Sequence, residues 1–124
     1  MASSVVEQLK SQQDCEHVLD CLYGLTGLER DCYQILLTAS DAYTAAELAE
    51  TVERDHSTVS RALNTLESHS LIIKTKQTYS KGGYEYVYES RELESVVEEM
   101  NSLIEQWCSN VLEMADEFNS KYQD

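Results

Sequence analysis

The chain has 124 residues, of which 42% are hydrophobic, so it is long enough and apolar enough for one globular domain. No apolar run approaches the roughly 20 residues of a membrane-spanning helix, and the first residues lack the basic and apolar regions of a secretory signal; a soluble cytoplasmic protein is therefore expected. The formal net charge is −14, from 23 acidic and nine basic residues, and such a surface would normally repel DNA and anionic lipid.

Three helix starts are marked by a Ser or Thr that is followed three residues later by Glu. In this pattern the hydroxyl caps one backbone amide and the Glu side chain reaches back to another. The pattern predicts helices that begin near residues 5, 27 and 45. The three pairs are Ser4 with Glu7, Thr26 with Glu29, and Thr44 with Glu47.

Two short helices follow one another closely in the middle of the chain. The first is expected over 45–52, and Asp55 is a good N-cap for the second. In the second helix Val59, Leu63 and Leu66 recur at i, i+4 and i+7 and form one buried stripe, while the opposite face is polar. Two short helices with this turn and this facing are typical of a helix-turn-helix, whose second helix enters the major groove of DNA.

The period of the sequence changes from helix to strand after Leu71. Residues 72–79 alternate as a half-exposed strand, and 84–88 return as a second strand with three tyrosines on one face. The turn at 80–83 contains two glycines, which adopt positive φ at little cost. A hairpin directly after a helix-turn-helix is a wing.

A single long helix is expected over about 90–119, with an unbroken heptad pattern. β-Branched residues at its a positions favour two-stranded packing, and at about 1.5 Å per residue the helix would be roughly 43 Å long. Homodimerisation is therefore expected. In the alternative, the stripe packs back on its own domain, together with the apolar residues of the first helix: Val5, Leu9, Leu19 and Leu22. The expected dimerisation residues are Leu93, Val97, Met100, Ile104, Trp107, Val111, Met114 and Phe118.

Together these elements predict a mainly α fold class with a small β-hairpin, in one domain over residues 1–124. An N-terminal helix would occupy 1–23, a winged helix-turn-helix 24–89, and a long C-terminal dimerisation helix 90–120.

The basic residues are concentrated in this winged helix-turn-helix. The segment Arg54–Lys81 holds five of the nine basic residues and two of the 23 acidic ones, so its net charge is about +3 and that of the rest is −17. Adaptation to a halophilic cytoplasm is the simplest explanation of the acidity. The alternative is an acidic protein that mimics nucleic acid or binds basic partners. The basic segment argues against it, because a DNA mimic has no use for one.

The polar face of the second short helix and the wing supply the candidate DNA contacts. Arg61 can donate two parallel hydrogen bonds to O6 and N7 of guanine, and Asn64 can pair with N6 and N7 of adenine. Hydroxyls near a helix start usually meet phosphates, as wing lysines do, and a slim Gly-containing tip can approach a minor groove. The candidate residues are His56, Ser57, Thr58, Ser60, Arg61, Asn64, Lys74, Lys76, Lys81 and Gly82.

Nothing in the sequence indicates catalysis. There is no nucleophile–base set, phosphate loop or metal cluster, so we expect no enzyme, no catalytic residue, no metal and no cofactor other than bound salt ions. We also expect no membrane partner and no small-molecule substrate. His17 and His69 are interpreted as ordinary histidines. The cysteines lack zinc-ligand spacing and are expected to be mostly buried hydrophobes, with a redox-sensing thiol as the alternative: Cys15, Cys21, Cys32 and Cys108.

The stretch from Asp20 to about Phe118 resembles the small haloarchaeal winged-helix regulators near the TrmB, PadR and Lrs14-like families. The matching pieces are DCLYGLTGLERDCYQILL, AAELAE, RDHSTVSRALNTLESHSLI, GGYEYVY and EEMNSLIEQW. The resemblance implies a homodimeric repressor or activator of promoter DNA, and an oxidative-stress role rests on it alone. Two departures are Ser70, where many members have Gly, and a less basic wing.

The sequence therefore predicts a sequence-specific DNA-binding transcriptional regulator that acts as a homodimer on inverted-repeat promoter sites. The alternative is a winged-helix protein-interaction module without direct DNA contact, since this fold also allows that function. Arg61 and the neighbouring lysines favour double-stranded DNA as the partner over a protein groove.

Overall fold

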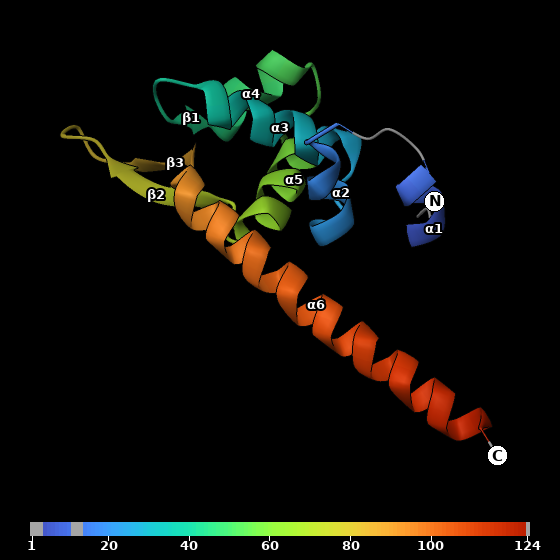
Figure 1. Ribbon diagram of the computed structural model, residues 1–124. Helices are drawn as coiled ribbons and strands as arrows, with labels where there is room; N and C mark the ends of the chain where they lie inside the picture. The colour runs from blue at the N-terminus through green and yellow to red at the C-terminus, as the bar shows by residue number, and fades with distance from the viewer. Residues whose placement is uncertain (1–3, 11–13, 124) are drawn as a thin grey trace.

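The computed structural model of the protein describes residues 4–10 and 14–123. Figure 1 shows α3, α4 and α5 grouped together, with the hairpin of β2 and β3 projecting from this group and α6 extending well beyond it. The elements in chain order are α1 (Val5–Lys10), α2 (His17–Tyr23), α3 (Gly27–Thr38), β1 (Tyr43–Thr44), α4 (Ala45–Val52), α5 (His56–Ser68), β2 (Ile72–Thr78), β3 (Tyr84–Ser90) and α6 (Leu93–Tyr122).

The three predicted helix starts are confirmed. The amide of Glu29 donates to Thr26 Oγ1 at 3.3 Å, and the amide of Thr26 donates to Glu29 Oε1 at 2.9 Å. Thr44 and Glu47 repeat this reciprocal pair at 2.9 and 3.1 Å. At α1 the amide of Glu7 donates to Ser4 Oγ at 3.1 Å. Local hydrogen bonding thus sets where α1, α3 and α4 begin.

The core lies between α3, α4, α5 and the base of the sheet. The predicted stripe of α5 is confirmed, because Val59, Leu63 and Leu66 are each 0% exposed. Tyr33 of α3 and Leu48 of α4 pack in the same buried cluster. This packing fixes α5 with its polar side toward solvent, as a winged helix-turn-helix requires.

The sheet has three strands in the order β1-β3-β2, and both pairings are antiparallel. The predicted hairpin is confirmed, but β1 was not predicted. A strand of two residues leaves no alternating pattern, and Thr44 is also the N-cap of α4. β1 pairs Tyr43 with Tyr88 and so ties the start of the helix-turn-helix to the base of the hairpin.

The predicted single N-terminal helix over 1–23 is wrong, because the chain forms two helices. Residues 1–3 and 11–13 of that span lie outside the described residues. The amides of His17 and Val18 donate to the carbonyls of Asp14 and Cys15, at 3.1 and 3.3 Å, and this turn starts α2. α2 buries Leu19 in the core, whereas α1 buries none of its residues. Burial of Leu19 thus holds α2 against the core, a contact that α1 lacks.

α6 begins three residues later than predicted, because Ser90 still pairs with Ile72 in the sheet. Val96 is buried and Met100 partly buried against the core, so Met100 packs within the domain instead of lying free in the predicted dimerisation stripe. From residue 101 to 123 every side chain is exposed. The alternative in which the stripe packs back on its own domain therefore holds for Met100, and from residue 101 onward it does not. Among the described residues, no helix is both long and apolar enough to cross a membrane.

Ser70, between α5 and β2, adopts a left-handed conformation with φ of 61°. This explains why glycine is common here in the resembling regulators, since a Cβ disfavours positive φ. We expect Ser70→Gly to raise the free energy of unfolding by about 0.5–1 kcal/mol, because relief of strain exceeds the added chain entropy. Urea denaturation followed by circular dichroism measures this change. Ser60→Gly, in the interior of α5, should have the opposite sign, and a destabilised Ser70→Gly would contradict the explanation.

Candidate nucleic-acid interface

Asp55 organises the start of α5 through three hydrogen bonds. Its carboxylate accepts from the Ser57 hydroxyl at 2.5 Å and from the Thr58 hydroxyl and amide at 2.6 and 3.1 Å. The Ser57 bond, followed by the Thr58 bonds, holds the pKa of Asp55 well below its ordinary range. The charged form is therefore favoured by folding, and this contribution to stability is present at neutral pH and lost as the pH falls through the acidic range.

Two predicted phosphate contacts are therefore already engaged within the protein. The hydroxyls of Ser57 and Thr58 both donate to Asp55, and a phosphate would have to compete with a carboxylate for them. Their observed role is to cap α5 and fix its first turn. Their role as phosphate contacts stays a prediction.

The other predicted residues of α5 lie together on its polar face. His56, Arg61 and Asn64 are exposed and Ser60 is partly exposed, whereas the opposite stripe is fully buried. Ser60 Oγ lies 3.4 Å from His56 Nδ1, and Arg61 Nη2 is 3.4 Å from Thr58 Oγ1. The Arg61 contact is long, so its guanidinium can turn toward a base edge, and Asn64 is exposed on the same face. The structure thus brings the predicted base-reading residues onto one solvent-facing surface.

The hairpin presents its lysines along one face and at its tip. Lys74 Nζ lies 4.2 Å from the centre of the Tyr86 ring, and Lys76 Nζ lies 4.2 Å from that of Tyr84. Sequence reasoning placed these tyrosines on one face but gave them no function. The alternation of side chains in both strands could have revealed this contact, because it places the lysines and the tyrosines on the same side of the hairpin.

The tip of the hairpin is exposed and closed by backbone hydrogen bonds. The amide of Tyr79 donates to the carbonyl of Gly83 at 3.1 Å, and that of Gly82 donates to the carbonyl of Tyr79 at 3.0 Å. Gly82 has φ of 93°, a conformation that glycine adopts without strain. Lys81 beside it is exposed, as its predicted role requires.

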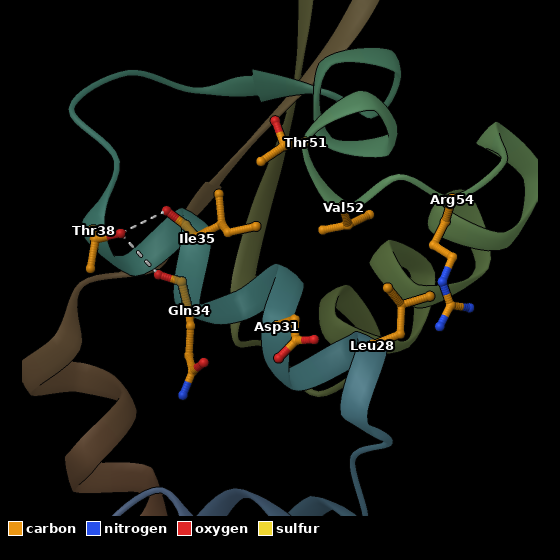
Figure 2. Close-up of a pocket in the computed structure, with 8 residues that line it drawn as sticks. All are labelled: Leu28, Asp31, Gln34, Ile35, Thr38, Thr51, Val52 and Arg54. Carbon is orange, nitrogen blue, oxygen red and sulfur yellow. Dashed lines mark hydrogen bonds between the residues drawn. The ribbon is translucent and has the colours of Figure 1, made fainter.

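An open groove of about 530 Å³ lies between α3 and α4. Figure 2 shows side chains of α3 on one side of the groove, and on the other side those of α4 together with Arg54 of the turn before α5. Sequence reasoning did not foresee it. The lining residues are Leu28, Asp31, Gln34, Ile35, Thr38, Thr51, Val52 and Arg54. Nowhere in the described part of the chain do three or more His, Cys, Asp or Glu side chains gather closely enough to hold a metal ion.

The prediction that the cysteines are mostly buried is wrong. Cys32 is buried, but Cys15, Cys21 and Cys108 are exposed. Burial raises the pKa of Cys32 to about 11, and the side-chain hydrogen bond to Glu16 raises that of Cys15. Neither thiol is activated by its surroundings, because a reactive thiol needs a lowered pKa.

The comparisons with known proteins agree with this geometry. Over residues 19–94 the sequence matches the family described as sugar-specific transcriptional regulator TrmB. An uncharacterised protein of Methanocaldococcus jannaschii is 32% identical over 111 residues, which are 90% of this chain and 90% of that protein.

Two solved structures are similar to this fold. A possible transcriptional regulator from Methanosarcina mazei has a TM-score of 0.77 and 18% identity, with 92% of each chain covered. The S. aureus protein MepR in complex with DNA has a TM-score of 0.53 and 19% identity, covering 96% of this chain and 81% of that chain. At such low identity these two structures show a shared winged-helix fold.

Proposed function

Because this chain belongs to the TrmB family of transcriptional regulators, we propose that it binds double-stranded DNA in a sequence-specific way through α5 and the hairpin. One observation carries the proposal: the polar face of α5 presents Arg61 and Asn64 to solvent inside the segment Arg54–Lys81, whose net charge is about +3. The complex of MepR with DNA supports it, since that protein has a similar fold.

The proposed regulator is a homodimer that recognises an inverted repeat. The exposed apolar stripe of α6 supports this, with Val97 at 43% and Trp107 at 53% exposed. A two-fold pairing would place two copies of α5 in successive major grooves, about 34 Å apart. The two half-sites of the operator would then be inverted copies of one another.

We further propose that the regulator belongs to a halophile and acts in its oxidative-stress response. The net charge of −14 supports the first part, and the resemblance to haloarchaeal stress regulators supports the second. Genome-wide mapping of bound DNA with and without oxidant tests both the DNA binding and the stress role. Absence of any enriched DNA would favour the protein-interaction module, and enrichment that oxidant leaves unchanged would remove only the stress role.

Arg61 should read one base position of the operator. We expect Arg61→Ala to weaken binding to the operator by about 1–3 kcal/mol and to relax base preference at a single position, because a bidentate contact to guanine is lost. Fluorescence anisotropy against a set of operators, each with one changed base pair, measures both effects. An unchanged preference at every position would refute the assigned role. Glu67→Ala, an exposed residue further along α5, is the control.

A further inference from the structure

Four side chains of the hairpin form a regular arrangement, and the proposed function gives no role to its two tyrosines. We call Lys74, Lys76, Tyr84 and Tyr86 the Lys–Tyr cluster. Each lysine ammonium lies 4.2 Å from the centre of a tyrosine ring, and the two rings meet edge to face with 5.7 Å between their centres. Because β2 pairs with β3 in register, each lysine reaches the ring one step further toward the tip.

The cluster is exposed although half of its members are aromatic. Tyr84 is 56% exposed and Tyr86 is 40% exposed, so neither ring is held in the core of the domain. A surface lysine normally samples many rotamers, and ordering it on binding costs conformational entropy. Placement of the ammonium over a ring face limits those rotamers before any partner arrives. The tyrosines therefore restrict the lysine side chains directly, and they contribute only weakly to the stability of the folded domain.

The cluster also lies on a defined side of the hairpin. It shares its face with Ile72 and Tyr88, which are buried in the core against the helices. The acidic residues of the hairpin, Glu85 and Glu89, alternate onto the opposite face, where the Tyr79 hydroxyl donates to Glu85. Positive charge on the hairpin is thus turned toward the side on which the helices lie, and negative charge away from it.

We propose that Tyr84 and Tyr86 are positioning residues that hold Lys76 and Lys74 in place for the sugar–phosphate backbone of duplex DNA. The inference rests on the proposed function. It adds an account of how DNA binding by the wing lysines depends on salt. Counterion release falls away at high salt, so lysine charge alone contributes little there. The entropy saved by a pre-positioned lysine does not depend on salt. The tyrosines thus allow wing contacts to persist in the ionic strength that the acidic surface suggests.

The test is a double-mutant cycle in the full chain, read by fluorescence anisotropy. The probe is a mixed-sequence duplex of about 30 base pairs, because phosphate contacts need no operator. We expect Tyr86→Leu to weaken binding by about tenfold in a dimer that loses two cation–π contacts, by the same factor at low and high salt. In the Lys74→Gln background Tyr86→Leu should have no effect. Tyr86→Phe keeps the ring and should bind like the original chain.

A matched control lies on the opposite face. Tyr79 is 44% exposed, so Tyr79→Leu removes a similar ring from the same hairpin without touching the cluster. It should leave binding within about twofold, the size of effect expected without a direct contact. Lys74→Gln should reduce the slope of log K against log salt by about 0.9 per protomer, while Tyr86→Leu leaves the slope unchanged.

Each contrary outcome has a separate meaning. Equal losses for Tyr86→Leu with and without Lys74 would overturn the positioning role, because the tyrosine would then act independently. An equal loss for Tyr79→Leu would also overturn it, since the hairpin as a whole would be responsible. If the original chain binds duplex DNA and Tyr86→Leu binds equally well, only this inference fails. If the original chain binds no duplex even at low salt, the proposed function fails with it.

Discussion

Replacing Ile104 with glutamate should convert the proposed dimer into a monomer and weaken operator binding by about 100-fold or more, since bivalent attachment is lost. Ile104 occupies an a position in the middle of the α6 stripe, where it is 37% exposed in a single chain. In a two-stranded pairing the two copies of this residue would face each other. A pair of unpaired carboxylates buried there would cost several kcal/mol. Sedimentation at micromolar concentration measures the association, and anisotropy measures the affinity for DNA.

Ser102→Glu is the matched control for this experiment. It adds the same charge two residues away, at the f position, which points away from a two-stranded interface. It should remain a dimer and bind DNA normally. A monomeric original chain would contradict dimerisation altogether, whereas a dimeric Ile104→Glu variant would show that the interface lies elsewhere.

Salt gives a second readout of the same interface. α6 contains seven acidic residues and one basic residue, so its net charge is −6 and two copies side by side repel each other. Raising the salt concentration screens this repulsion and also strengthens apolar burial when the anion is strongly hydrated. Dimerisation of the original chain should therefore tighten with salt, while its phosphate contacts weaken. Operator binding at high salt would depend on the balance of these two opposed effects.

The elements that the sequence predicted well are those specified by local chemistry. Thr26 and Thr44 each define a helix start within three residues, because both halves of their capping boxes are short-range. The stripe of α5 follows from helical periodicity alone, and the hairpin follows from alternation around Gly82 and Gly83. Such features depend on neighbours in the chain, so one sequence is enough to find them.

Most of the features that the sequence did not predict depend on contacts between distant segments. β1 exists because Tyr43 pairs with Tyr88, and a strand of two residues is too short to be predicted from alternation in the sequence. Leu19 anchors α2 in the core whereas α1 buries no residue, and Met100 packs on the core because α6 starts beside β3. Within the site, periodicity found the polar face of α5 but did not show that Asp55 already binds the hydroxyls of its first turn. Helical periodicity shows which side chains face solvent, but it does not show which of their hydroxyls are already hydrogen-bonded to the N-cap residue.

Leu63→Ala should lower the free energy of unfolding by about 2–5 kcal/mol, a large part of the roughly 5–15 kcal/mol that holds a domain of this size together. Leu63 is 0% exposed and lies in the core that fixes α5 against α3 and α4. Its removal leaves a cavity that rigid neighbouring elements fill only partly. Urea denaturation measures the loss.

The next residue along the helix should affect DNA binding and not stability, so the two variants together separate folding from DNA recognition. Asn64 is exposed on the polar face, so Asn64→Ala should change stability by no more than about 0.5 kcal/mol, while it weakens operator binding by about 1–3 kcal/mol. Leu63→Ala, measured at a temperature where it remains folded, should bind the operator nearly as well as the original chain, because it removes no atom from the DNA-facing surface. If both variants lost affinity equally without unfolding, α5 would not divide into a buried face that positions it and an exposed face that reads DNA, and the major-groove assignment would fail.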